Sequence, residues 1–126
     1  MSAVTVGRAL SALAILFLAF DTAIKIAGAS VVAETLGALG YSPDLGVTIG
    51  VVELVCVVLY AVPRTAVLGA ILLTALFGGG IATHIRVGSP LFTHILFGVY
   101  LGLFVWGGLY LRNERLRELI PAMRWA

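Results

Sequence analysis

The sequence predicts an all-α integral membrane protein, a four-helix bundle with a short interfacial helix between its first and second spans. One observation is the composition: 61% of the 126 residues are hydrophobic and 11% are charged, too few polar residues to cover a soluble globule. The other is that the apolar residues form four runs of about 20 residues, the length that a spanning helix needs. These runs are Val6–Ile26, Leu45–Val62, Thr65–Ile85 and Leu91–Leu111. They fill most of the chain, so we expect a single transmembrane domain over residues 1–126.

The first span ends with two opposite charges. Asp21 and Lys25 lie at i and i+4 with the acid first, the orientation that favours a helical ion pair. One interpretation is a self-neutralising pair at the membrane boundary, with Lys25 reaching toward water. The other is the charged lining of a binding site, because charges deeper in a membrane usually serve a function.

The segment 30–41 is too short and too polar to cross the membrane. Ser30 suits its start as a cap, and Gly40 suits its end. One helical face carries Val32, Thr35, Leu36 and Leu39. We therefore predict a brief helix lying at the membrane interface. The following Ser42-Pro43 pair predicts the start of the second span, with Ser42 as its N-cap.

The second span contains Glu53, about 13 Å along the helix from its start and near the middle of a ~30 Å hydrocarbon core. An unpaired ionised carboxylate is unfavourable there, so Glu53 is either protonated or faces a partner inside the bundle. Cys56 and Tyr60 follow at i+3 and i+7 on the same face. Cys56 is the only cysteine, so we expect a small core residue and no intrachain disulfide.

The third span follows a turn at 62–65 so short that the second and third spans must be antiparallel neighbours. Its far end is unusually polar for a spanning helix. That end carries Gly78, Gly79, Gly80, Thr83, His84 and Arg86. The three glycines leave a notch without side chains, which either admits a closely packed helix or leaves room for a small ligand.

The fourth span begins at Ser89-Pro90, which repeats the earlier start signal, and His94 lies about one turn inside it. Smooth surfaces for helix packing are expected at Gly98, Gly102, Gly107 and Gly108. The tail 112–126 is basic, and one face carries Leu116, Leu119, Ile120 and Met123. We interpret it as an amphipathic segment on the membrane surface, or as a charged tail that only sets topology.

The basic residues predict the orientation. The side that holds both termini carries Arg8, Arg64, Arg112, Arg115, Arg117 and Arg124. Only Lys25 and Arg86 lie opposite. Because positive charges collect on the cytoplasmic side, we expect both termini in the cytoplasm. The inner half, apart from its interface residues, is then expected to be almost purely apolar.

The same orientation gathers the polar side chains in the outer half, where we predict a pocket with Glu53 at its floor. The catalytic candidates are Glu53 and His84, and the ligand-binding candidates are Asp21, Lys25, Thr83, Arg86 and His94. The two histidines are expected to meet across the 87–90 loop, one donating and the other accepting a hydrogen bond. We predict no metal site, because neither H-x-x-x-H nor E-x-x-H spacing occurs. The alternative is an inter-helix hydrogen-bond network that locks the bundle.

Three stretches resemble one family. They are Arg8…Phe20-Asp21-x-x-x-Lys25, Glu53…Tyr60-x-x-Pro63-Arg64 continuing to Thr74, and Ala82-Thr83-His84-x-Arg86-x-Gly88. Together they are similar to the DoxX-like family of small four-helix membrane proteins, over nearly the whole chain. The resemblance implies a four-span bundle in the bacterial cytoplasmic (inner) membrane. By the family's name it also implies a link to the membrane subunit of a thiosulfate:quinone oxidoreductase.

Three hypotheses for function follow. The first is a redox-associated subunit that binds a quinone or another small hydrophobic ligand in the outer-half pocket, with Glu53 and His84 handling protons. The second is a proton-coupled small-molecule transporter that uses Glu53, and the third is a non-catalytic assembly or scaffold protein. The expected partners are the lipid bilayer and either a redox protein or further copies of the chain. Nucleic acid is not expected, because a net charge of +2 with so few charged residues forms no basic face.

Overall fold

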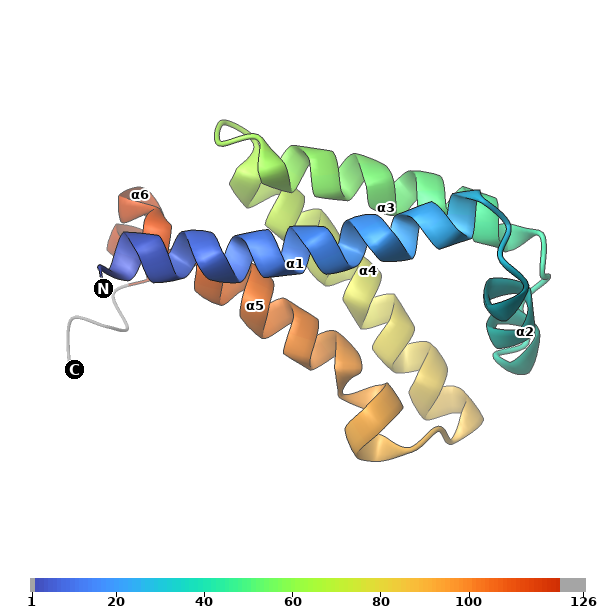
Figure 1. Cartoon of the computed structure of the whole chain (residues 1–126). Helices are drawn as coiled ribbons and strands as arrows, with labels where there is room; N and C mark the ends of the chain where they lie inside the picture. The colour runs from blue at the N-terminus through green and yellow to red at the C-terminus, as the bar shows by residue number, and fades with distance from the viewer. Residues whose placement is uncertain (1, 121–126) are drawn as a thin grey trace.

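The computed structural model describes residues 2–120, and every regular element within that range is helical (Figure 1). The elements are α1 (Ala3–Ile26), α2 (Ser30–Ala38), α3 (Leu45–Ala61), α4 (Ala66–Val87), the π-helical turn η1 (Leu91–Ile95), α5 (Phe97–Arg112) and α6 (Glu114–Leu119). The prediction of an all-α chain is therefore confirmed. Part of the predicted amphipathic tail, residues 121–126, lies outside the described range.

Three stretches are long and apolar enough to cross a membrane: α1, α4 and the 22 residues of η1 and α5 together. The fourth, α3, is apolar but has only 17 residues. Large apolar side chains cover the outside of the molecule, where Leu16, Phe92 and Leu103 expose 68%, 72% and 66% of their surface. A surface of this kind is unsuited to water. The chain is a membrane protein with several apolar helices.

The four long helices form a cycle of contacts. Helix α1 packs against α3 and α5, and α4 packs against the same two helices from the other side. Figure 1 shows that α1 and α3 run side by side, whereas α4 and α5 cross them and lead away toward η1. The helices therefore converge near the N-terminus and diverge at the end where α2 and η1 lie.

Glycines allow the close approach at the convergent end. A Cβ atom on Gly69 of α4 would overlap the backbone of Tyr60 in α3. A Cβ atom on Gly108 of α5 would overlap Ser11 of α1, and one on Gly7 would lie 2.7 Å from the Gly108 carbonyl oxygen. Small residues at such crossings let two helix backbones touch.

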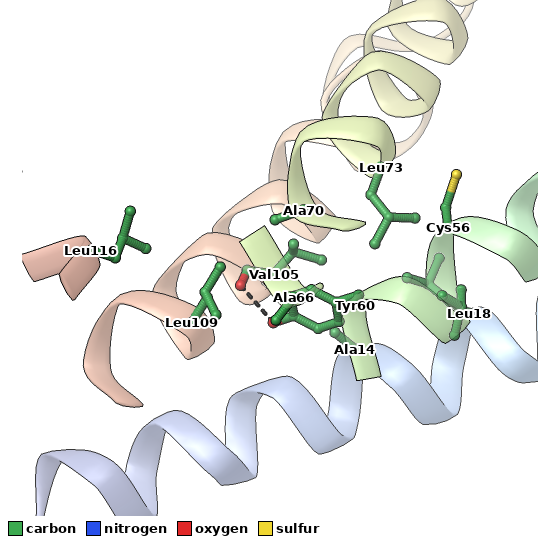
Figure 2. Close-up of a cluster of buried hydrophobic side chains, with 11 residues drawn as sticks. Ala14, Leu18, Cys56, Tyr60, Ala66, Ala70, Leu73, Val105, Leu109 and Leu116 are labelled. Carbon is green, nitrogen blue, oxygen red and sulfur yellow. Dashed lines mark hydrogen bonds between the residues drawn. The ribbon is translucent and has the colours of Figure 1, made fainter. Parts of the chain in front are cut away.

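The hydrophobic core occupies this convergent end (Figure 2). It contains Ala14, Leu18, Cys56, Val57, Tyr60, Ala66, Ala70, Leu73, Val105, Leu109 and Leu116. Cys56 is buried there, which confirms the expectation of a small core residue. Glu53 is buried as well, so the predicted face of Glu53, Cys56 and Tyr60 does point inward.

Several local predictions were wrong. Ser42 does not cap α3, because Asp44 is the residue before the helix and no side chain caps it. Ser30 is the first residue of α2 and makes no cap either. The fourth span is not one continuous α-helix, since the amides of His94 and Ile95 both donate to the carbonyl of Pro90 and open a wide π-helical turn. The predicted stop at Gly40 is consistent with its positive φ of 85° just after α2.

Candidate functional site

A cavity of about 700 Å³ lies at the divergent end of the molecule, between α1 and α3 on one side and α4 and α5 on the other. Helix α2 covers part of it with Val31, Val32, Thr35 and Leu36, and Leu39 directly after the helix adds to this cover. Most of the lining is aliphatic or aromatic. Its polar members include six of the seven predicted site residues: Asp21, Lys25, Glu53, Thr83, His84 and His94.

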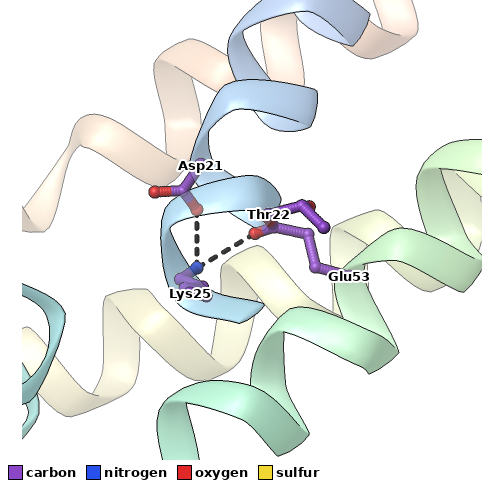
Figure 3. A network of polar contacts seen from close by, with 4 residues as sticks. All are labelled: Asp21, Thr22, Lys25 and Glu53. Atoms are coloured by element: carbon purple, nitrogen blue, oxygen red, sulfur yellow. Dashed lines mark hydrogen bonds and ion pairs between the residues drawn. The ribbon is translucent and has the colours of Figure 1, made fainter. Parts of the chain in front are cut away.

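One polar wall is a three-residue ion cluster (Figure 3). The Nζ atom of Lys25 lies 2.6 Å from Oδ2 of Asp21 and 3.1 Å from Oε1 of Glu53. The helical ion pair predicted from the spacing of Asp21 and Lys25 is therefore present. Lys25 also reaches across to α3, so its ammonium group joins carboxylates from two helices.

Glu53 is almost fully enclosed, with 3% of its surface exposed. The hydroxyl of Thr22 donates a 2.6 Å hydrogen bond to its Oε2, and Lys25 donates to Oε1. Both carboxylate oxygens are thus occupied, as burial of a charged group requires. Of the two alternatives for Glu53, the structure places it against partners inside the molecule.

Two glycines of α3 allow α1 and α2 to approach this helix closely. A Cβ atom on Gly50 would lie 2.9 Å from Cβ of Lys25, and one on Gly46 would lie 3.0 Å from Val32. These glycines form a G-x-x-x-G motif one turn and two turns before Glu53. Neither this motif nor Thr22 was predicted from the sequence. The signal for Thr22 was its helical spacing of three or four residues from the other buried residues of α1, which are Gly7, Ser11, Ala14 and Leu18.

A second polar wall is formed by the two histidines. Their ring centroids lie 5.5 Å apart with an interplanar angle of 67°, an edge-to-face contact. The predicted meeting across the 87–90 loop is confirmed. The expected hydrogen bond between the rings is replaced by separate bonds: Nδ1 of His84 bonds to Ser89 at 2.8 Å, and Nδ1 of His94 bonds to Thr93 at 2.7 Å.

Two contacts attach the residues that follow α2 to α4. The Thr83 hydroxyl donates its one proton to the carbonyl of Gly79. In the 2.8 Å contact between Tyr41 and Thr83, the Tyr41 hydroxyl is therefore the donor and Thr83 the acceptor. Arg86 donates a 2.7 Å hydrogen bond to the carbonyl oxygen of Leu39, directly after α2. Arg86 is not among the residues that line the cavity, and Tyr41, which is, was not a candidate in the sequence analysis.

The three consecutive glycines of α4 leave open space. A Cβ atom on Gly78, Gly79 or Gly80 would meet nothing within 4 Å outside its own stretch of helix. Gly79 and Gly80 line the cavity, whereas Gly78 does not. Of the two uses expected for this notch, close helix packing is absent and room beside the helix is present.

The convergent end holds a second polar network, contrary to the expectation of an almost purely apolar inner half. Nε of Arg112 donates to the hydroxyl of Ser11 at 3.0 Å, and that hydroxyl lies 2.8 Å from the hydroxyl of Tyr60. Tyr60 in turn donates to the carbonyl of Val105 at 2.6 Å. Because each hydroxyl has one proton, Ser11 must donate to Tyr60. The series of hydrogen bonds therefore runs in one direction, from Arg112 through Ser11 and Tyr60 to the Val105 carbonyl. The arginine had been interpreted only as a topology charge.

Metal binding finds no support in side-chain clustering. Among residues 2–120, no group of three or more histidine, cysteine, aspartate or glutamate side chains is arranged to hold a metal ion. The polar walls can instead exchange hydrogen bonds with a ligand. Lys25 supplies donors, the carboxylates supply acceptors and the imidazoles supply either, beside a large apolar surface.

A family model described as the DoxX-like family matches residues 9–108. No curated protein and no solved structure matches the chain. The matched segment runs from α1 into α5, and it therefore includes the ion cluster, both histidines and α2. The chain belongs to the DoxX-like family.

Proposed function

We propose that this protein crosses the bacterial cytoplasmic membrane four times, with both termini in the cytoplasm and α2 at the outer interface. The distribution of arginines toward the termini supports the orientation. The short α3 has 17 residues, within the range that spans a bilayer. The cavity then opens in the outer half of the bundle, and the network of Arg112, Ser11 and Tyr60 lies in the inner half.

The cavity is proposed to bind a quinone or another small hydrophobic ligand, as part of a redox-associated membrane subunit. The observation that carries this proposal is an apolar cavity of about 700 Å³ with polar groups on two walls. Small-molecule sites combine such a size with a mostly apolar lining and a few polar groups that orient the ligand. Phe17, Phe77 and Phe97 supply flat apolar surface for a ring.

Roles for individual side chains follow from their places. Glu53 and His84 are the proposed proton-handling groups, one on each polar wall. Asp21, Lys25 and His94 are proposed to contact the polar part of the ligand. Thr83 acts with Tyr41, and Arg86 acts indirectly by holding α2 over the cavity. Electrons would come from a partner protein.

The test fills the cavity without touching its polar groups. Gly80→Leu places a side chain in the cavity, and Gly78→Leu adds the same side chain one position away from the lining. We expect a short-chain quinone analogue to bind wild type and Gly78→Leu in nanodiscs alike, and to bind Gly80→Leu at least tenfold more weakly. Glu53→Gln and His84→Ala are expected to weaken binding too. Equal binding by all five proteins would refute the proposal.

Mass spectrometry of protein extracted gently from its own membrane complements this test, because it shows which small molecule co-purifies. A stoichiometric quinone supports the redox proposal. The transporter alternative instead requires substrate-driven proton movement in liposomes that is lost in Glu53→Gln. The scaffold alternative requires that Glu53→Gln and His84→Ala impair folding while no ligand is found.

A further inference from the structure

The carboxylate of Asp21 has an oxygen that faces away from the ion cluster. Its Oδ2 accepts from Lys25, whereas the other oxygen points away from both Lys25 and Glu53 (Figure 3). No residue between 2 and 120 donates a hydrogen bond to that second oxygen. Asp21 lines the cavity, and its side chain is 30% exposed. The cavity wall therefore presents a charged acceptor that protein groups leave unbonded.

Lys25 presents a donor at the same place. An ammonium group carries three N–H bonds. Two of them go to Asp21 and Glu53 in the structure, which leaves one. Lys25 also lines the cavity. The remaining acceptor of Asp21 and the remaining donor of Lys25 thus lie on the α1 wall, in two residues that are bonded to each other through Oδ2 and Nζ at 2.6 Å.

We infer that the cavity selects a ligand whose polar head is a neutral hydroxyl, an inference that rests on the proposed binding of a small hydrophobic molecule. A hydroxyl donates one hydrogen bond and accepts others, so it satisfies Asp21 and Lys25 together. A carbonyl or ether oxygen only accepts. When such a ligand displaces water from the cavity, the Asp21 oxygen is left without a donor, which weakens binding.

Charged heads fit less well. An alkylammonium would donate to Asp21, but it has no lone pair to accept from Lys25, so the remaining N–H of Lys25 would stay without an acceptor. A carboxylate head would meet Asp21 and Glu53 as like charges and has no proton to donate. For a quinone-type ligand, the same reasoning selects the hydroxyl-bearing quinol over the oxidised quinone.

The experiment compares three ligands that share one ring and one chain: 4-octylphenol, 4-octylanisole and 4-octyltoluene. The phenol donates and accepts, the anisole only accepts, and the toluene does neither. Binding to the full chain in nanodiscs is measured by equilibrium dialysis, with protein-free nanodiscs as the baseline for partitioning. We expect the phenol to bind about tenfold more tightly than the anisole, the size of effect that one unpaired buried polar group produces.

Two variants of Asp21 locate the preference. In Asp21→Ala the ratio between phenol and anisole is expected to fall to about one, because no carboxylate remains. Asp21→Asn keeps the shape of the side chain, and its amide can donate to the anisole oxygen, so the ratio between phenol and anisole falls in this variant as well. This second variant keeps the test valid if Asp21→Ala misfolds. Asp44→Ala removes an exposed acid outside the cavity lining and should keep the wild-type ratio.

The outcomes separate the two proposals. If none of the three ligands binds above the nanodisc baseline, the proposed ligand-binding function fails, and this inference fails with it. If all three bind with equal affinity and Asp21→Ala changes nothing, the cavity binds ligands but the hydroxyl preference is wrong. A preference that persists in both Asp21 variants would also overturn it.

Discussion

Lys25 joins two carboxylates that belong to different helices. An isolated charge inside a membrane is strongly unfavourable, so the charge of each member of the cluster depends on the others. Glu53 is the most enclosed of the three, and its partner Thr22 is neutral. Removal of Lys25 therefore leaves Glu53 without a compensating charge.

Lys25→Met is expected to lower the free energy of unfolding by about 3–5 kcal/mol, the range seen when one partner of a buried pair is removed. Glu53→Gln should have a smaller effect, because the amide oxygen still accepts from Thr22 or Lys25. The measurement is reversible unfolding of the detergent-solubilised protein in SDS. The double variant Lys25→Met/Glu53→Leu, which removes both charges, should recover part of the loss. No recovery would mean that the pair does not set the stability of this wall.

Single residues also show which features a sequence can predict. The i, i+4 spacing of Asp21 and Lys25 predicted their ion pair, whereas the depth of Glu53 predicted either a protonated carboxyl or an unnamed partner. Threonine roles are harder to predict, because a helical threonine can satisfy its hydroxyl on its own backbone. Thr35 and Thr74 do so, bonding to the carbonyls four residues earlier, whereas Thr22 reaches another helix.

At the scale of helices, glycines on one and the same helix have opposite surroundings in space. Gly69 contacts the backbone of α3, whereas Gly78, nine residues later on the same helix, faces open space. Both would be described as small residues suited to packing. The difference arises because α3 and α4 meet at their shared turn and separate along their length.

Gly69→Ala is expected to destabilise the protein by about 1–3 kcal/mol, because its Cβ atom would overlap the backbone of Tyr60, which cannot rotate away. Gly78→Ala has no such contact and should stabilise α4 by roughly 0.5–1 kcal/mol through helix propensity. Unfolding of the two variants under identical detergent conditions measures the difference. Similar effects from both substitutions would show that α3 and α4 are not in backbone contact at Gly69.

Helix α2 packs against α3, and the residue directly after it is bonded to α4. Only Val32 and Leu36 of its nine residues are buried, and Arg86 bonds to the carbonyl of Leu39 just after it. Arg86→Leu is expected to increase amide hydrogen exchange of residues 30–38 several-fold, because opening of α2 then breaks one contact fewer. Exchange is measured by mass spectrometry in nanodiscs. Arg64→Leu removes an exposed arginine from the turn between α3 and α4 and should leave α2 unchanged.

The ends of the apolar runs agree with the ends of the helices to within three residues. The internal hydrogen-bond pattern of an element was not predictable. The wide geometry of the turn η1 comes from two amides that share the Pro90 carbonyl, and the apolar pattern does not predict this sharing. Likewise, Gly98 packs against Ile81, whereas Gly102 has no neighbour within 4 Å, although the G-x-x-x-G spacing treats them alike.

For the whole molecule, the several apolar helices were predictable, because they follow from hydropathy along the chain. The cavity itself was less predictable. Its volume depends on the angle at which α4 and α5 leave α1 and α3, and no local pattern encodes an angle between helices. The polar chain from Arg112 to Val105 was missed for the same reason, since its members come from three helices.

The proposed orientation is a property of the whole chain and is tested as one. A fluorescent protein that folds only in the cytoplasm is expected to fluoresce when fused after Ala126. A periplasmic phosphatase reporter is expected to be active when inserted at Gly88, in the loop before η1. The reverse pattern would place the arginine-rich side outside and contradict the orientation. Replacing Arg112, Arg115 and Arg117 with glutamine should reduce the preference for the orientation with cytoplasmic termini, measured with the same two reporters.

Because α4 touches the backbone of α3 at Gly69, a small rotation of α4 about this contact displaces the far end of the helix. Fifteen residues of helix separate that contact from His84, about 22 Å at 1.5 Å per residue. A rotation of α4 by about 10° around the contact would therefore move the end that carries His84 by about 4 Å. Substitutions buried in the apolar core can in this way resize the cavity without touching any residue that lines it. A substitution at the crossing point is then expected to change the size of the ligand that the cavity accepts.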